Sequence, residues 1–77
     1  MALHKATKLR LEWRLLKGAD EIVCEVWARG AGFESRLVKS GEAILLEEAR
    51  SDSELRLVQQ RWRSDLELLG WKWAPLH

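Results

Sequence analysis

The chain has 77 residues and a formal net charge of +1, with 47% hydrophobic and 32% charged residues. That length allows one domain with a single two-layer core, and this composition is typical of a folded protein rather than a disordered one. No stretch is long and apolar enough to cross a membrane, and we expect one domain over residues 1–77 with poorly ordered ends at 1–6 and 74–77.

Charge is unevenly distributed along the chain. Residues 1–17 carry five basic residues and one acidic residue, a net of +4, whereas residues 42–77 carry five basic and seven acidic residues, a net of −2. This contrast is weaker than in most nucleic-acid-binding domains and is typical of a solvated basic strand. The single cysteine, Cys24, excludes an internal disulfide and has no metal-ligand spacing around it. Because MALHKATK lacks an apolar run of signal-peptide length, we expect a cytoplasmic protein.

The first two predicted elements form a hairpin. Residues 7–17 (TKLRLEWRLLK) and 20–29 (DEIVCEVWAR) each alternate apolar and polar residues, as strands with one buried face do. Gly18-Ala19 between them fits a two-residue turn with glycine first. This turn predicts four cross-strand pairs on one face: Leu15 with Ile22, Trp13 with Cys24, Leu11 with Val26, and Leu9 with Ala28.

Gly30-Ala31 is a second turn of the same kind and predicts a third strand over residues 32–39. This strand extends the buried face, because the turn places Phe33 opposite Ala28, Ser35 opposite Val26 and Leu37 opposite Cys24. The other face then pairs Glu25 with Arg36 and Val23 with Val38.

Residues 42–49 (EAILLEEA) are compatible with two structures. Their residue types favour a helix, which would give a three-stranded sheet followed by two helices. Ser40-Gly41 instead fits a hairpin turn that pairs Leu37 with Ile44 and Ser35 with Leu46. We favour the fourth strand, because a wider sheet better matches the length of the final helix.

The strongest pattern in the chain predicts a helix over residues 51–70. Ser51 and Glu54 match the capping-box pattern at its start, and Gly70 suits the left-handed position at its end. Trp71 then folds back onto Leu66. One apolar stripe at helical spacing consists of Leu55, Val58, Trp62, Leu66 and Leu69.

Together these elements predict an α+β fold, in which an antiparallel meander of three to four strands carries one C-terminal amphipathic helix on one face (ββββα). The stripe of the helix covers the apolar face of the sheet. The predicted buried residues of the sheet are Leu9, Leu11, Trp13, Leu15, Ile22, Cys24, Val26, Phe33, Leu37, Ile44 and Leu46.

Residues suited to catalysis are scarce. The two histidines, His4 and His77, lie in the termini, and Cys24 is on the inward face of a central strand. Glu12 and Glu25 are predicted to lie opposite each other with arginines around them, which favours a neutralised surface network over a cation site. We therefore predict no catalytic, cofactor-binding or metal-binding residues, no small-molecule substrate and no enzymatic activity.

The sheet face turned away from the helix is more informative. In the predicted register it carries large apolar residues among charged ones, and a solvated face rarely does so. The far side of the helix adds Leu57 and Leu68 outside the main stripe. The candidate interaction surface consists of Arg10, Arg14, Leu16, Val23, Trp27, Arg36, Val38, Leu45, Leu57 and Leu68.

Two functions fit this surface. The first is a small non-enzymatic interaction domain that binds a protein, most simply a second copy of itself in a homodimer. The alternative is a module for single-stranded nucleic acid, in which bases stack on Trp27 while Arg10, Arg14, Arg29 and Arg36 reach phosphates. In the predicted register Arg10 lies opposite Trp27, so a local cation–π pair competes with this second function.

Overall fold

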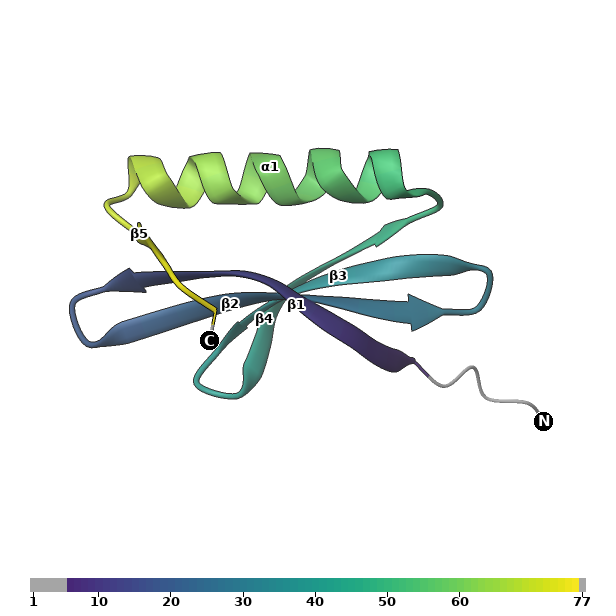
Figure 1. Ribbon diagram of the computed structural model, residues 1–77, viewed down its shortest axis with the longest axis horizontal. Helices are drawn as coiled ribbons and strands as arrows, with labels where there is room; N and C mark the ends of the chain where they lie inside the picture. The colour runs from purple at the N-terminus through teal and green to yellow at the C-terminus, as the bar shows by residue number, and fades with distance from the viewer. Residues whose placement is uncertain (1–5, 77) are drawn as a thin grey trace.

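The computed structural model describes residues 6–76, which form one antiparallel sheet and one helix. The elements in chain order are β1 (Thr7–Lys17), β2 (Asp20–Arg29), β3 (Gly32–Lys39), β4 (Glu42–Ala49), α1 (Asp52–Leu68) and β5 (Lys72–Ala74). The strand order across the sheet is β4-β3-β2-β1-β5, and α1 lies along one face of it (Figure 1). The predicted ββββα arrangement is confirmed, residues 42–49 form a strand, and β5 is an addition.

The three predicted turns each contain two residues. Gly18 and Gly30 have φ values of 60° and 57°, and each is followed by an alanine with ordinary φ, as a turn with glycine first requires. Ser40 and Gly41 both have positive φ, 53° and 79°, which is the pattern of a type I′ turn. The turns therefore set the strand order as the sequence predicts.

The β2–β3 register is as predicted, with Phe33 opposite Ala28 and Leu37 opposite Cys24. The β1–β2 register is correct only for the half near the turn, where Trp13 pairs with Cys24 and Leu15 with Ile22. The pairing of residues 7–11 is different, because the register shifts twice, between Lys8 and Arg10 and between Leu11 and Trp13.

These two shifts move side chains of β1 to the other face of the sheet. Leu11 pairs with Glu25 rather than with Val26, and Arg10 takes the place opposite Val26. Paired residues of an antiparallel sheet share a face, so Leu11 lies on the face away from the helix. The prediction that Leu9 and Leu11 are buried is wrong, because both are exposed.

The β3–β4 register also differs from the prediction. A register shift between Leu37 and Val38 makes Leu45 the partner of Leu37, and Leu46 the partner of Arg36. Ile44 and Leu46 are exposed, so their predicted burial is wrong. The apolar residue with which β4 reaches the core is Ala49, opposite Phe33.

The core lies between α1 and the helix-facing side of the sheet. One cluster combines residues of β1, β2 and β3 with Val58 and Trp62 of the helix, and a second joins Val26, Ala49 and Leu55. Leu66 and Trp71 pack against the first cluster, whereas Leu69 of the predicted stripe is exposed. The members of the first cluster are Trp13, Leu15, Ile22, Cys24, Leu37, Val58 and Trp62.

Both ends of α1 have the predicted caps. The backbone N–H of Glu54 donates to Ser51 Oγ over 3.2 Å, and Ser51 has extended backbone angles. At the other end Gly70 has φ 99°, and the N–H groups of Gly70 and Trp71 donate to the carbonyls of Glu67 and Leu66. This is a Schellman motif, and it brings Trp71 onto the core.

The chain after the helix returns to the sheet as β5. Ala74 is buried and pairs with Arg14, and Arg14 Nη1 donates to the carbonyl of Pro75 over 2.9 Å. We expected residues 74–77 to be poorly ordered, but Ala74 and Pro75 are held against β1. Residues 1–5 and 77, which the same expectation covers, lie outside the described residues.

Candidate interaction surface

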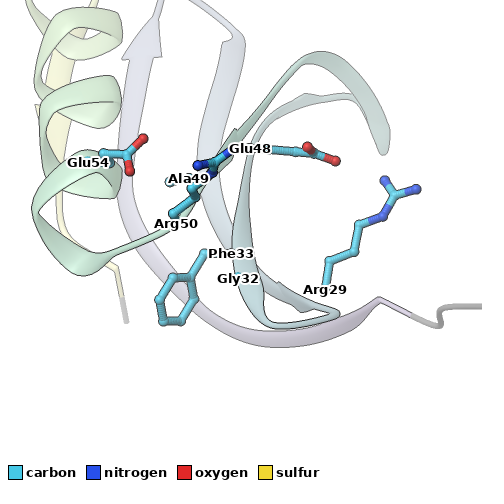
Figure 2. Close-up of a pocket in the computed structure, with 7 residues that line it drawn as sticks. All are labelled: Arg29, Gly32, Phe33, Glu48, Ala49, Arg50 and Glu54. Atoms are coloured by element: carbon cyan, nitrogen blue, oxygen red, sulfur yellow. The ribbon is translucent and has the colours of Figure 1, made fainter.

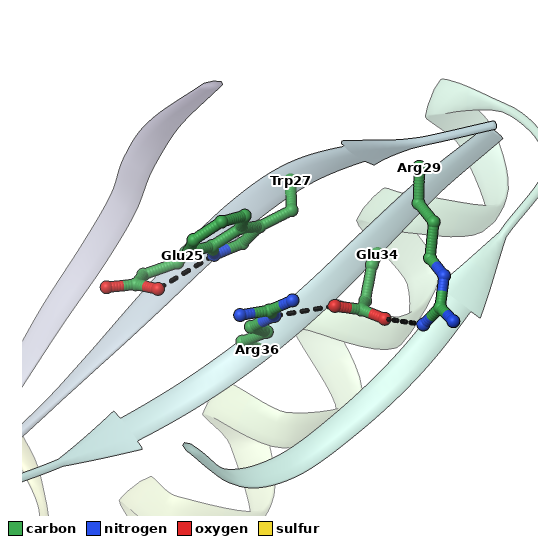
Figure 3. A network of polar contacts seen from close by, with 5 residues as sticks. All are labelled: Glu25, Trp27, Arg29, Glu34 and Arg36. Atoms are coloured by element: carbon green, nitrogen blue, oxygen red, sulfur yellow. Dashed lines mark hydrogen bonds and ion pairs between the residues drawn. The ribbon is translucent and has the colours of Figure 1, made fainter. Parts of the chain in front are cut away.

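The face of the sheet away from α1, here called the outer face, carries a network of charged side chains around Trp27. Figure 3 shows Glu25, Trp27, Arg29, Glu34 and Arg36 on this face, with the helix behind the strands. Arg36 lies over the Trp27 ring, with its guanidinium carbon 3.8 Å from the ring centroid. The indole N–H of Trp27 donates to Glu25 over 2.8 Å, and Lys8 pairs with Glu25 over 3.1 Å.

Glu34 is the most buried charged group of this network, with a side chain that is 2% exposed. It accepts hydrogen bonds from Arg36 Nε over 2.5 Å and from Arg29 Nη1 over 2.9 Å. Burial by itself raises the pKa of the Glu34 carboxyl group, but the two arginines lower it by more, so the pKa lies below its ordinary value. Glu34 is therefore an ionised centre that orders two arginines on the outer face.

The arrangement around Trp27 differs from the one predicted. Lys8, not Arg10, pairs with Trp27 across the strands, because of the two register shifts in β1. Arg10 lies on the helix-facing side opposite Val26 and forms an ion pair with Glu12. The prediction that Glu12 and Glu25 oppose each other is wrong as well, since Leu11 is the partner of Glu25.

Other candidate residues of the outer face are more covered than the sequence suggested. Leu16, Val23, Val38 and Arg14 are all partly buried on this face. Arg14 is also tied to the chain terminus through Pro75 and forms an ion pair with Glu21. The outer face is therefore largely occupied by its own contacts.

The remaining candidates lie elsewhere. Leu45 belongs to the helix-facing side, since it pairs with Leu37, so its predicted place on the outer face is wrong. Leu57 and Leu68 are exposed on α1 as expected. Of the two tryptophans near the C-terminus, Trp71 is packed, whereas Trp73 is exposed with Arg63 over its ring at 5.1 Å.

The largest departure from the prediction is on β4. Ile44, Leu45 and Leu46 are three consecutive aliphatic residues, and their exposed fractions are 51%, 44% and 54%. In the described part of the chain β4 is the terminal strand of the sheet and pairs only with β3. We call the side of Glu42–Ala49 that is not paired with β3 the β4 edge. The sequence EAILLEEA does not indicate that these three residues are exposed together, because nothing in it marks the register shift at Ile44.

The other side of the sheet is only partly covered. β5 covers β1 only from Arg14 to Leu16, next to the turn into β2 (Figure 1). The rest of β1, residues 7–13, has no neighbour on that side among residues 6–76 and is interrupted by two register shifts. This half of β1 is therefore a second, less regular strand segment with one side unpaired.

Two hollows lie at the margins of the sheet. The first, of about 340 Å³, is lined by residues that flank the β2–β3 turn, by the end of β4 and by the start of α1, with charges of both signs. Figure 2 shows Glu54 on the helix side of this hollow, with Glu48 and Arg29 extending away from the helix. The second, of about 360 Å³, lies between β1 and α1 and is lined by Glu12, Trp13, Arg56, Gln59, Gln60 and Arg63.

Groups that could support chemistry are scarce in the described residues. Within 6–76 no three histidine, cysteine, aspartate or glutamate side chains gather as a metal site would require. Cys24 is buried, and burial raises the pKa of its thiol to about 11 although Ser35 lies 3.5 Å away as a hydrogen-bond partner. Over the same residues no helix is long and apolar enough to cross a membrane.

No family model matches the chain, and neither the curated proteins nor the solved structures include one with significant similarity to it.

Proposed function

We propose that this protein is a small interaction domain that acts by binding a second copy of itself, with a homodimer as the smallest product. The observation that carries the proposal is the β4 edge, where three consecutive exposed aliphatic residues lie on an unpaired strand. A strand of this kind presents free backbone N–H and C=O groups beside apolar side chains, and both favour pairing with another strand.

The other apolar surfaces support the proposal less well. On the outer face, Arg36 covers the Trp27 ring and the charged groups are paired with one another. On α1, Leu57 and Leu68 lie eleven residues apart and do not form a continuous patch. The thiol of Cys24 is buried and weakly acidic, which supports a role without catalysis and agrees with the reducing cytoplasm that we propose as its location.

Sedimentation velocity over a wide range of protein concentration tests this proposal. We expect the wild type to shift from monomer to larger species, and the variant Ile44→Lys/Leu46→Lys to stay monomeric with unchanged circular dichroism. Both residues are more than half exposed, so lysine is tolerated in the monomer. The matched control is Leu57→Lys/Leu68→Lys on α1, which should associate like the wild type. A wild type that stays monomeric at every concentration would overturn the proposal.

Binding of single-stranded nucleic acid is the second candidate, and Trp27 with its neighbouring arginines is its basis. A base that stacks on the ring face covered by Arg36 must first displace Arg36, and that step also breaks the Arg36–Glu34 hydrogen bond. Tryptophan fluorescence with oligonucleotides at low salt tests it. Quenching that is absent in Trp27→Leu would support this candidate, and no quenching in the wild type would end it.

A further inference from the structure

We infer that the strand that pairs with the β4 edge is the free half of β1, residues 7–13, of the second copy, in a head-to-tail arrangement. This inference rests on the proposed self-association and names the partner surface. Both segments lack a strand neighbour on one side among residues 6–76, and the third unpaired stretch there, the outer side of β5, is only three residues long. Three kinds of observation support the pairing: strand direction, charge and exposed apolar residues.

Strand direction is compatible with the pairing. The four long strands form an antiparallel meander, so β1 and β4 run in opposite directions. A second copy moved sideways across the sheet without inversion brings its β4 beside β1 in the antiparallel sense. The joined sheet then continues the meander, and both helices stay on the same face.

Charge favours this pairing over pairing of two β4 edges. Residues 42–49 contain three glutamates and no basic residue, whereas residues 7–13 contain Lys8 and Arg10 against Glu12. Two β4 edges would bring two sets of three glutamates together, and like charges across strands are unfavourable. Glu42 and Glu48 are both exposed, and no side-chain partner for either is seen in the described residues. Opposite charges therefore meet only in the head-to-tail arrangement.

Apolar residues are present on both segments. Leu9 and Leu11 are exposed on β1, and Ile44, Leu45 and Leu46 are exposed on β4. Lys8 forms an ion pair with Glu25, and Arg10 forms one with Glu12. The lysine and arginine side chains are about half exposed, so both ion pairs can rearrange at low cost. Each segment thus carries exposed leucine or isoleucine together with charged residues, and the net charge is positive on residues 7–13 and negative on residues 42–49.

A head-to-tail pair leaves one β4 edge and one β1 segment free. Such an interface is heterologous, and further copies add to it unless the rotation between copies closes a ring. We therefore expect species larger than a dimer as the protein concentration rises. We also expect association to weaken as salt is added, because opposite charges attract across the interface.

Charge reversal on each segment tests the inference. Variant A, Glu42→Lys/Glu48→Lys, changes residues 42–49 from three negative charges to a net of +1, and variant B, Lys8→Glu/Arg10→Glu, changes residues 7–13 from +1 to −3. Each variant alone places like charges at the interface, and we expect about tenfold weaker association or more for either one. A mixture of A and B places opposite charges together again and should restore association. The matched controls are Lys72→Glu on β5 and Glu67→Lys on α1, which should behave as the wild type.

The outcomes separate this inference from the proposed function. A monomeric wild type ends both. Wild-type association with an unaffected variant B means that β4 pairs with β4, which overturns the inference and keeps the proposal. A mixture that stays monomeric also overturns the inference, provided that circular dichroism shows both variants folded. Association that strengthens with salt would likewise point to like charges at the interface.

Discussion

Glu34 shows how one buried carboxylate organises a surface. Its side chain is almost fully covered on a face that carries no second layer, and Arg29 and Arg36 are held over it. Because Arg36 also stacks on Trp27, the carboxylate indirectly fixes the position of the indole ring. Once the carboxylate holds the guanidinium group in place, stacking of the same group on the aromatic ring costs little further conformational entropy.

Glu34→Gln should therefore destabilise the fold in a pH-dependent way. At neutral pH we expect a loss of about 2 kcal/mol in the free energy of unfolding, because two arginines lose their charged partner. The pKa of Glu34 lies below the ordinary 4.5, so its stabilising contribution is complete above that pH and is lost as the pH falls through the folded-state pKa.

Urea denaturation of wild type and Glu34→Gln, followed between neutral pH and about pH 3, measures this effect. The difference between the two proteins should shrink as the pH falls. Glu48→Gln is the matched control, since Glu48 pairs with Glu34 across the strands but is exposed. An equal difference at both ends of the pH range would contradict the role given to Glu34.

Cys24 should be chemically inert in the folded protein. Burial raises the pKa of its thiol to about 11, and Ser35 and Gln59 form a buried polar chain beside it. With a disulfide reagent at pH 8 we expect labelling at least about 100-fold slower than for an exposed cysteine. The control is Leu68→Cys in a Cys24→Ala background, because Leu68 is exposed. Equal labelling rates would show that Cys24 is accessible.

At the scale of the elements, the sequence was most informative where turns and periodicity agree. The three two-residue turns, the β2–β3 register and both caps of α1 followed from local residue types. Each of these depends on neighbours in sequence or on one glycine in a required conformation. Such features need no knowledge of the rest of the fold.

The register shifts were not predictable by the same means. A bulge adds one residue to one strand, and a strictly alternating sequence such as LRLEW gives no local sign of where that residue is placed. The consequence was large, because Arg10 and Leu11 changed faces and Leu9 lost its predicted burial. The exposed β4 residues have the same origin, a single shift near Ile44. The candidate surface therefore changed although the fold did not.

β5 was missed for a related reason. Lys72–Ala74 is only three residues long, and its pairing with β1 depends on where the Schellman motif directs the chain after α1. Lys17 Nζ also donates to the carbonyl of Leu69 over 2.7 Å, which ties the helix end to the first hairpin. These contacts join residues more than fifty positions apart, beyond the reach of any local pattern.

Gly32 gives a test of how closely β3 and β4 approach. A Cβ atom at this position would lie 2.8 Å from the carbonyl oxygen of Ala49, which is part of the core with Leu55. We expect Gly32→Ala to cost about 1–3 kcal/mol of unfolding free energy, because backbone must move. Gly30→Ala is the comparison, since a Cβ there meets nothing within 4 Å and only its φ of 57° is unfavourable.

Urea denaturation again provides the measurement, together with exchange of the β4 amides. Gly32→Ala should loosen the end of β4 near Ala49, whereas Gly30→Ala should leave β4 unchanged. If Gly32→Ala is as stable as the wild type, then β3 and β4 are less closely packed than the structure indicates.

At the scale of the whole molecule, the two sides of the sheet differ in charge and in how much of the terminal strand is covered. One side ends in a short strand, a proline and a bulged basic segment, and the other ends in eight residues of acidic, aliphatic β4. The buried face of α1 covers the helix-facing side of the sheet through Leu55, Val58 and Trp62. The unpaired sides of the sheet are therefore the parts of the fold left for binding.

The central claim is that β4 is where a second copy binds, and amide hydrogen exchange at low and high protein concentration tests it most directly. At high concentration the amides of residues 43–48 should exchange at least about tenfold more slowly, because hydrogen bonds to the partner strand protect them from solvent. The amides of α1 serve as the internal reference and should not change. Identical exchange of residues 43–48 at both concentrations, in a sample whose mass shows association, would contradict the claim.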